Sequence, residues 1–470
     1  MASVQASASS PRDADAILRR IGDRLMARRS AIRTGQWIVV TGYLFLVAVP
    51  AFLPMPDAAA HLWNNVTLFA QFAFWDFWWP VVLVSLIFVG RGWCGLFCPE
   101  GSLTEAVSAH GRGLALPRWL TWQGWPFVAF AGTTIYGQMV SVTHYPKPAL
   151  VLLGGSTGAA IMTGYLYGRN KRVWCRYLCP VTGVFGLLAK LAPLHFRVDL
   201  EAWTRWTKPR GTIPVRVDCA PLVSIPTMRG GSLCHMCGRC SGFRGAVTLA
   251  RRSPNHEIVH VAAGEPRPWE TALIVFGLLG IAAAALHWTS SALYASVRQS
   301  LAAWLLAQGL VWPLEPMLPW WILTNYPDHK DMLTPLDGAV LVGYVVACSL
   351  VVGGLVSLVL MAAARLLGAW SPARFHHLAQ SLVPVAGCGV FLGLSAQTVT
   401  ILRGEGLALD FVGVLRAALL AGASFWSLLL AWQITGVHTA APLRRAASML
   451  PLGLAVVVAS ASWAALFWRF

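Results

Sequence analysis

The chain has 470 residues, of which 56% are apolar and only 12% are charged, so it is too hydrophobic for a soluble protein. Its mean hydropathy is +0.60, and apolar runs of about 20 residues recur along it, which indicates an integral membrane protein. Collagen-like, disordered and soluble all-β classes are excluded. The net charge of +17 would suggest a nucleic-acid partner for a soluble protein, but in a membrane protein we expect none and ask instead which face is basic.

Nine apolar segments are long enough to cross a bilayer. All should be helices, because backbone polar groups in lipid must be satisfied within the chain. The sequence therefore predicts an all-α polytopic membrane protein with about nine transmembrane helices. The predicted spans lie at about 35–55, 67–90, 119–142, 149–168, 269–289, 338–364, 378–402, 411–433 and 446–468.

The basic residues divide very unevenly between the two faces of such a bundle. With the N-terminus inside, the cytoplasmic segments hold 30 Lys and Arg, the opposite segments hold 5, and Arg416 lies within a span. Positive charge concentrates on the cytoplasmic side of membrane proteins. We therefore expect the N-terminus on the cytoplasmic side of the membrane and the C-terminus on the opposite side.

Four parts follow from this topology. They are a basic cytoplasmic N-terminal segment (1–34) without the features of a cleaved signal peptide, a four-helix membrane unit (35–192), a soluble cytoplasmic insert (193–268), and a five-helix C-terminal membrane domain (269–470). The last part contains a long outer loop (290–337), where the apolar run Leu301–Trp312 is too short to span and predicts an interfacial or re-entrant helix.

Two copies of one cysteine pattern, R-x-W-C-x-x-x-C-P, follow the second and fourth predicted spans, 81 residues apart. Their position suggests a unit of two helices and a motif used twice in the same orientation, so that four thiols approach one pseudo-symmetry axis. The C-x-x-x-C-P spacing also forms the second half of the ferredoxin ligand run. Alone, such a motif could be two small residues packed one turn apart, but its duplication favours redox or metal ligation. The four cysteines are Cys94, Cys98, Cys175 and Cys179.

A third group, C-x-x-C-x-x-C, lies in the soluble insert at Cys234, Cys237 and Cys240. Three thiolates at this spacing can bind one corner of a [4Fe–4S] cubane. The usual fourth ligand is missing, because Arg244 and Gly245 occupy the Cys-Pro position, and Cys219 is the other cysteine of the insert. We expect Cys219 to complete a second cluster, and a Cys₄ zinc site is the alternative.

Other polar residues and cysteines allow two interpretations each. Asp76 in the second span has either a proton or ion role or a plain interfacial position beside aromatic residues. Glu100 and Glu105 are interpreted as a solvated helical turn, and Cys348 and Cys388 as ordinary buried thiols. Paired histidines could bind a b-type haem, but no two lie in mid-span at matched depth, so we do not expect haem. The histidines concerned are His287, His376, His377 and His438.

In the outer loop, the cluster of Asp328, His329 and Asp331 could touch a metal or a basic partner, but turn chemistry around Pro327 is the simpler interpretation.

These motifs resemble the membrane-bound polyferredoxins with paired C-x-x-x-C-P motifs (NapH, NosR and CcoG-like proteins) over about residues 35–260. The resemblance implies electron transfer at the bacterial inner membrane and a ferredoxin-like insert. The ligands that it carries over are Cys94, Cys98, Cys175, Cys179, Cys234, Cys237 and Cys240.

The chain departs from this family pattern in two ways: the insert has one incomplete ferredoxin motif plus Cys219, and about five further spans follow residue 268. With these two features the chain resembles the polyferredoxin subunit of Ftr-type ferrous-iron permease systems.

Two functions from different classes fit these features. The first is an electron carrier, rather than an enzyme with its own substrate, with two [4Fe–4S] clusters. It would pass electrons between a cytoplasmic or quinone partner and a periplasmic redox or iron-handling protein beside a membrane permease. The outer loop contains Trp312, Trp320 and Trp321. We expect these tryptophans either to dock the periplasmic protein or to anchor in lipid headgroups. The second is a metal transport or metalloenzyme maturation accessory whose cysteines stage or sense metal. Few polar residues lie within the spans, which favours the electron carrier.

Overall fold

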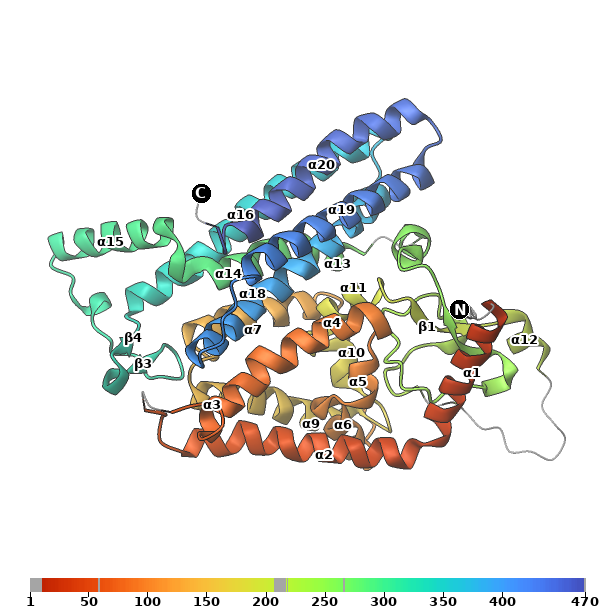
Figure 1. The fold of residues 1–470 in the computed structure, drawn as a ribbon, viewed down its shortest axis with the longest axis horizontal. Helices are drawn as coiled ribbons and strands as arrows, with labels where there is room; N and C mark the ends of the chain where they lie inside the picture. The colour runs from red at the N-terminus through yellow and green to blue at the C-terminus, as the bar shows by residue number, and fades with distance from the viewer. Residues whose placement is uncertain (1–10, 58–59, 207–216, 218, 265–266, 469–470) are drawn as a thin grey trace, which may run out of the picture.

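The structure is a computed structural model that describes residues 11–57, 60–206, 217, 219–264 and 267–468. Each of the four predicted regions has residues outside the described part: 1–10 in the N-terminal segment, 58–59 in the four-helix unit, 207–216, 218 and 265–266 in the insert, and 469–470 in the C-terminal domain. Within the described part the chain is mostly helical, with two small antiparallel sheets (Figure 1). The predicted all-α class is confirmed.

The helices begin and end at residues that suit helix termini. Many begin with proline, whose fixed φ and missing N–H suit the first helical position, and Thr334 and Asp337 form a capping box at the start of α16. The first-half helices are α1 (Pro11–Ala27), α2 (Arg29–Ala48), α3 (Val66–Gln71), α4 (Trp79–Val89), α5 (Gly92–Leu96), α6 (Pro99–Ser108), α7 (Trp125–Met139), α8 (Pro146–Ala149), α9 (Gly155–Tyr167), α10 (Val173–Tyr177), α11 (Thr182–Ala189) and α12 (Leu200–Arg205). The second-half helices are α13 (Pro268–Ala272), α14 (Ala283–His287), α15 (Ala292–Ala307), α16 (Pro335–Leu366), α17 (Pro372–Ala379), α18 (Val383–Gly404), α19 (Val412–His438) and α20 (Pro442–Ala464).

Eight helical segments of the described chain are long and apolar enough to cross a membrane. Several join two α-helices through a π-helical stretch, as at Phe72–Trp78 between α3 and α4. Five of the eight follow the insert, as predicted. The segments are Arg29–Phe52, Val66–Val89, Pro146–Tyr167, Pro268–Ser290, Pro335–Leu366, Pro372–Gly404, Val412–His438 and Pro442–Ala464.

The predicted count of nine spans is not confirmed, because the predicted span at 119–142 contains only the 15-residue helix α7. Its first part, from Trp119, forms turns, and the helix begins only at Trp125, just before Pro126. α7 nevertheless runs parallel to the segment that starts at Pro268. Trp122 packs against Trp269 near the start of both, and Trp288 Nε1 donates a hydrogen bond of 2.9 Å to Gln138 near the end of both.

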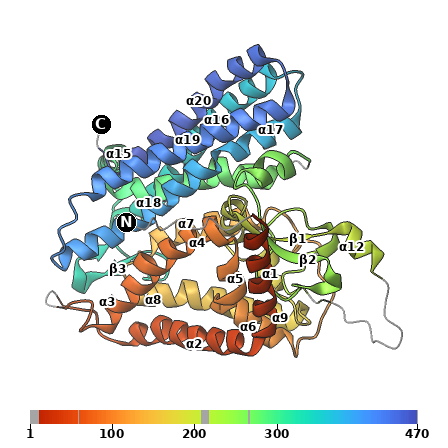
Figure 2. The ribbon, with the colours of Figure 1, turned by 45° about the vertical axis from the view of Figure 1, so that its right-hand side comes forward.

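The extramembrane parts lie at opposite ends of the helical bundle (Figure 1). One end, which we call the motif end, carries α1, the cysteine motifs, α12 and the sheet of β1 (Leu194–Val198) and β2 (Val247–Arg251). The other, the loop end, carries α15 and the hairpin of β3 (Asn325–Tyr326) and β4 (Asp331–Met332). In Figure 2 the N-terminal spans lie below and α16, α19 and α20 above, with α18 between them.

A continuous apolar core joins the two halves of the chain. Leu86 of α4, Leu188 of α11 and Leu278 of the π-helical stretch after α13 are all buried in it, together with Leu382 and Trp463 from the C-terminal spans. The C-terminal domain therefore packs directly on the unit that carries the cysteine motifs. A smaller core around Phe196, Val247 and Leu249 holds the insert together.

The loop end contains a helix that begins earlier than predicted. The apolar run Leu301–Trp312 lies only partly in α15, which starts at Ala292 and ends at Ala307. Leu301 and Trp304 are exposed on it. Beside it, Tyr145 stacks on Tyr326 of β3 and donates a hydrogen bond of 2.8 Å to Asp331 of β4. Asp331 therefore holds the hairpin to the bundle, which agrees with the interpretation of this cluster as part of a turn.

Candidate functional site

The first cysteine motif lies where the chain turns out of the second span. Gly90 has φ +61°, a conformation that favours glycine, and it leads into the short helix α5 with Cys94. Cys98 follows in an extended conformation and caps α6, where its Sγ accepts a hydrogen bond of 3.4 Å from the Gly101 N–H. Pro99 is the first residue of α6 and fixes this start. The local sequence thus holds both thiols on one rigid turn.

The second motif repeats this local structure 81 residues later. α10 corresponds residue for residue to α5, and Cys179 and Pro180 again precede a helix, α11. Thr182 occupies the position that corresponds to Gly101. The duplication that the sequence predicts is therefore also a duplication of backbone structure.

The arginines of the two motifs cross between the copies. Arg172 of the second copy donates a hydrogen bond to the backbone oxygen of Cys94 in the first. Arg91 of the first copy donates to Thr182 Oγ1 at 2.8 Å, and Thr182 donates to the backbone oxygen of Cys175 at 2.8 Å. Both guanidinium groups are buried, with Arg91 3% and Arg172 1% exposed. Each arginine therefore fixes the cysteine-bearing turn of the other copy, a role that sequence reasoning missed although both arginines stand in the repeated pattern.

The thiols of the paired motifs lie near enough for their charges to act on one another. Burial raises the pKa of Cys98 well above its usual range, and the charges of Cys175 and Cys94 add to this effect. Burial also raises the pKa of Cys179, with smaller effects from Glu100, Cys175 and Cys98. Cys94 and Cys175 are buried, and Cys98 and Cys179 are partly buried. Thiols gathered in this way are unfavourable as free thiolates and favourable around a cationic centre.

Glu100 and Glu105 are not a solvated helical turn, so that interpretation is wrong. Glu100 accepts hydrogen bonds from Ser156 Oγ at 2.6 Å and from Trp174 Nε1 at 2.9 Å, and burial raises its pKa. Glu105 pairs with Arg172 at 2.7 Å and with Arg239 of the insert. Burial opposes ionisation of Glu105, but the two arginines outweigh it and lower its pKa. Both carboxylates join elements that are far apart in sequence.

The cysteines of the insert form a second set. Met236 and Gly238, between these cysteines, have positive φ values of 54° and 72°, and the Met236 N–H donates to Cys234 Sγ at 3.4 Å. The loop therefore wraps tightly around its own sulfurs. Burial raises the pKa of Cys234 well above its usual range, with added effects from the charges of Cys240, Cys237 and Cys219.

Cys219 lies beside this set and beside the second motif. Lys171 Nζ donates to the Cys219 backbone oxygen at 3.2 Å, and the Arg172 N–H donates to the Ala220 oxygen at 2.7 Å. Burial raises the pKa of Cys219, and Cys237 is among the charges that act on it. The structure thus brings together the four cysteines that the sequence assigns to the insert.

The two cysteine sets meet directly at Gly95 and His235. A Cβ atom on Gly95 would lie 2.0 Å from the His235 backbone oxygen and 3.0 Å from the Cys237 nitrogen, so only glycine fits there. The charge of Arg172 acts on Cys175 of one set and on Cys237 of the other. Backbone contact between adjacent motifs places the two candidate sites next to each other.

The space between the two sets is strongly cationic. His235 is buried, and burial together with the charges of Arg91, Arg172, Arg176 and Arg239 holds its pKa well below its usual range. Several buried N–H donors there have no hydrogen-bond partner, among them Arg172 Nη2 and Arg91 Nε. A thiolate-bound iron–sulfur cluster carries net negative charge and accepts hydrogen bonds at sulfur, so these residues fit such a group.

No group of three or more His, Cys, Asp or Glu side chains in the described ranges is arranged to hold a single metal ion. A cubane differs from a single ion, since each thiolate binds a different iron atom. If clusters are bound here, they supply one-electron redox chemistry, while the chain's own residues hold, bury and charge-compensate them.

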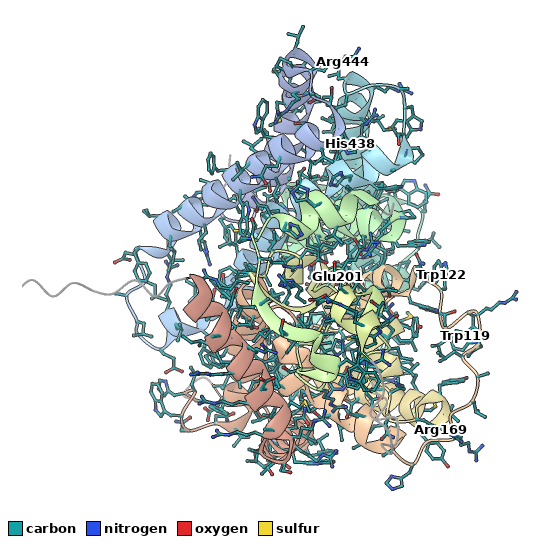
Figure 3. The ribbon with its side chains drawn as sticks, turned by 90° about the vertical axis from the view of Figure 1, so that its right-hand side faces the viewer. Trp119, Trp122, Arg169, Glu201, His438 and Arg444 are labelled. Carbon is teal, nitrogen blue, oxygen red and sulfur yellow. The ribbon has the colours of Figure 1, made fainter. Side chains whose placement is uncertain are left out.

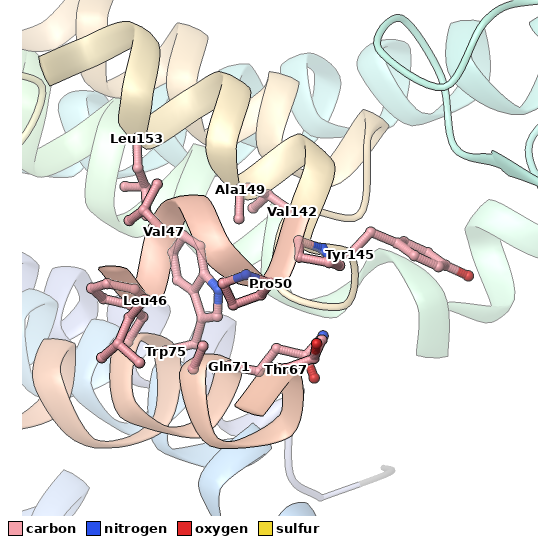
Figure 4. Close-up of a pocket in the computed structure, with 13 residues that line it drawn as sticks. Leu46, Val47, Pro50, Thr67, Gln71, Trp75, Val142, Tyr145, Ala149 and Leu153 are labelled. Carbon is pink, nitrogen blue, oxygen red and sulfur yellow. The ribbon is translucent and has the colours of Figure 1, made fainter. Parts of the chain in front are cut away.

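The remaining singled-out residues lie away from the two sets. Asp76 is 3% exposed and has no hydrogen-bond partner on either carboxylate oxygen, so a plain interfacial position does not fit it. Thr398 Oγ1 of α18 donates to the Asp76 backbone oxygen at 2.9 Å. Cys348 and Cys388 are only partly buried. Nearby, Trp75 and Gln71 line a narrow apolar pocket with Tyr145 (Figure 4).

The four histidines considered as haem ligands make protein contacts. His377 Nδ1 and His438 Nε2 are 2.9 Å apart, and His377 Nε2 lies 2.9 Å from the Ile258 oxygen. His376 contacts Thr271 Oγ1, and His287 contacts the Tyr344 hydroxyl.

Residues 71–117 and 150–199 match the profile of a family described as 4Fe-4S binding domain. Each matched stretch contains one C-x-x-x-C-P motif and span residues before it. The fold and the site therefore define a polytopic membrane protein with a 4Fe-4S binding domain, and the resemblance to membrane-bound polyferredoxins is confirmed.

Two curated relatives are similar to this chain. YccM of Escherichia coli (strain K12), a protein named for electron transport, is 24% identical over 223 residues, which cover 42% of this chain and 60% of YccM. Protein NirI of Paracoccus denitrificans (strain Pd 1222) is 29% identical over 138 residues, which cover 24% of this chain and 19% of NirI. The chain thus spans less than two thirds of either relative. No solved structure matches the chain.

Proposed function

We propose that this protein is an electron carrier of the bacterial inner membrane that holds two [4Fe–4S] clusters. Cys94, Cys98, Cys175 and Cys179 hold the paired-motif cluster. Cys219, Cys234, Cys237 and Cys240 hold the insert cluster. The observation that carries the proposal is the backbone contact between Gly95 and His235, which joins the two sets directly. A protein that uses metal only to stabilise its fold does not need two adjacent redox centres, whereas an electron carrier does.

The direction that we propose runs from the motif end toward the loop end. The predicted cytoplasmic segments carry 30 of the basic residues, and the structure gathers the cysteines, α1 and the insert at the same end of the bundle. Electrons would enter there from a cytoplasmic carrier or a quinone. They would leave toward a periplasmic redox or iron-handling protein that works beside a membrane permease. The relative YccM is named for electron transport, which supports electron transfer as such.

A quinone is a reasonable second donor because the motif end contains an open pocket of about 430 Å³. Its lining includes His256, His260 and Gln433, and Asn255 donates to Gln433 Oε1 at 2.9 Å. Glu257, adjacent to His256, accepts the N–H groups of Gly231 and Ser232 just before the insert cysteines. Polar side chains at the end of a span, close to the insert, would suit the headgroup of a quinone.

The transport alternative is supported by one residue. Asp76 is a buried carboxyl within a span, and such groups commonly mark ion or proton pathways. Its isolation from other charged side chains favours a single proton-binding group over a metal pathway, which needs several ligands along its length.

Vectorial electron transfer tests the proposed function. The protein is reconstituted in sealed vesicles that contain an impermeant oxidant, and an impermeant low-potential reductant is added outside. Vesicles with the protein should reduce the internal oxidant faster than vesicles with a variant in which Cys94 and Cys175 are replaced by serine. Equal rates for the two preparations, with clusters present in the first, would show that the protein does not carry electrons across the membrane.

A further inference from the structure

Helix α1 packs on the insert through one narrow face. Leu18 joins the core of the insert, and a Cβ on Gly22 would lie 2.7 Å from Ser241 Oγ and 3.2 Å from Leu249 Cβ. One turn later, Leu25 Cβ lies 2.6 Å from the position of a Cβ on Gly238. These positions are spaced by four and three residues, so they share one side of the helix.

The opposite side of α1 is basic and apolar. Arg20, Arg24 and Arg28 follow one another at intervals of four residues, so their side chains form one row, and all three are exposed. Ile17 and Ile21 form the adjacent row and are 53% and 41% exposed. Of the three acidic residues of α1, Asp13 and Asp15 precede these rows in the sequence, and Asp23 points elsewhere because it accepts a hydrogen bond of 2.9 Å from Ser241. We call the surface formed by Arg20, Arg24, Arg28, Ile17 and Ile21 the arginine strip.

The arginine strip lies directly over the insert cysteines. Gly238, which packs against Leu25, stands between Cys237 and Cys240 in the sequence. Just after α1, Arg29 at the start of α2 donates a hydrogen bond of 2.9 Å to the Arg239 oxygen. One helix, about 10 Å in diameter, therefore separates the strip from the loop that carries the insert cysteines.

We propose that the arginine strip docks an acidic, soluble one-electron carrier that reduces the insert cluster. This inference rests on the proposed function. In the transfer the carrier loses one electron and the insert cluster gains it, and no bond forms or breaks. Complementary charge steers and orients such an encounter, and exposed apolar side chains beside arginine supply contact area once the partners meet.

The position of α1 favours a soluble partner over the lipid surface. α1 packs mainly on β2 of the insert, and after Arg28 it leads directly into α2, the start of the first candidate span (Figure 2). Figure 3 looks onto this end, where α1 lies in front and Arg444 lies at the far top of the view.

Binding of a defined probe tests the proposal. The probe is an acidic plant-type [2Fe–2S] ferredoxin, and the protein is used as the full chain in nanodiscs. The strip variant combines Arg20→Glu and Arg24→Glu. The control variant combines Arg365→Glu and Arg444→Glu, which make the same charge change at exposed positions of the same end. The Kd of the probe and the rate of cluster reduction by the reduced probe are measured at several salt concentrations.

The strip variant should bind the probe at least about tenfold more weakly, should be reduced correspondingly more slowly, and should show a smaller salt dependence than the parent protein. The control variant should match the parent within about twofold. Normal cluster reduction by dithionite in both variants would show that folding and clusters are intact. If no preparation has clusters that dithionite reduces, the proposed function itself fails.

Three results would overturn the docking inference while leaving the proposed function in place. The first is equal weakening of probe binding in the strip and control variants, which would show that only the net charge of this end of the protein matters. The second is unchanged probe binding with loss of binding to vesicles of anionic lipid, which would assign the strip to the membrane. The third is reduction of the clusters by a quinol but not by the bound probe.

Discussion

Replacement of Gly95 by alanine should separate the two cysteine sets. The new Cβ would lie 2.0 Å from the His235 oxygen and 3.0 Å from the His235 carbon and the Cys237 nitrogen. These are backbone atoms, so no side-chain rotation can relieve the contact, and the loop of the insert must move. Overpacking of this kind lowers the free energy of unfolding by about 1–3 kcal/mol. Because the new Cβ meets backbone atoms, we expect a decrease at the upper end of this range.

Gly92 offers a matched control in the same short helix. A Cβ on Gly92 would meet only the Val89 side chain, at 3.4 Å, which is an ordinary contact. Alanine is favoured over glycine inside a helix by about 1 kcal/mol, so Gly92→Ala should be neutral or slightly stabilising. The difference between the two variants therefore isolates the contact between the sets.

Two measurements on the anaerobically purified variants check this reasoning. Gly95→Ala should lower the midpoint of thermal unfolding relative to Gly92→Ala and should weaken the magnetic interaction between the two reduced clusters in EPR spectra. The Gly92→Ala variant should match the parent protein in both. Equal thermal midpoints and equal spectra for the two variants would refute the direct contact at Gly95.

Further predictions concern the insert, the membrane and the loop end. Cys219→Ser should lower the iron content from about eight toward about four atoms per chain, whereas the control Cys388→Ser should retain about eight. Unchanged iron in Cys219→Ser, or bound zinc in the parent protein, would argue against the insert cluster. Asp76 should be held as an uncharged acid, because an unpaired buried carboxylate is costly, so a hydrophobic carbodiimide should label the parent and not Asp76→Asn; equal labelling would contradict this. Trp320→Ala combined with Trp321→Ala should weaken capture of a periplasmic partner with both clusters assembled, and loss of membrane insertion instead would indicate an anchoring role.

The cysteine arrangement could be predicted from sequence because its signal is local. The spacing within each motif and the exact 81-residue repeat are visible in the chain itself, and they predict that the copies share a backbone structure and a face. The structure repeats α5 as α10 and brings the four thiols together. The missing Cys-Pro likewise pointed to Cys219, which lies beside Cys237.

The contacts between the motifs could not be predicted in the same way, because they join residues far apart in sequence. The repeated arginines were visible in the pattern, but nothing local indicates that Arg172 reaches Cys94 or that Arg91 reaches Thr182. Glu105 was assigned to solvent for the same reason, since its partner Arg239 lies 134 residues away. Hydropathy also could not show that the segment before Pro126 forms turns rather than helix.

The central claim is that two adjacent [4Fe–4S] clusters are bound at the motif end, and one measurement tests it most directly. Iron and acid-labile sulfide are quantified in the anaerobically purified protein, and the same sample is reduced for EPR spectroscopy. Two bound clusters should give about eight iron and eight sulfide per chain and the spectrum of two interacting reduced clusters. About four iron with an isolated-cluster spectrum, or zinc in place of iron, would contradict it.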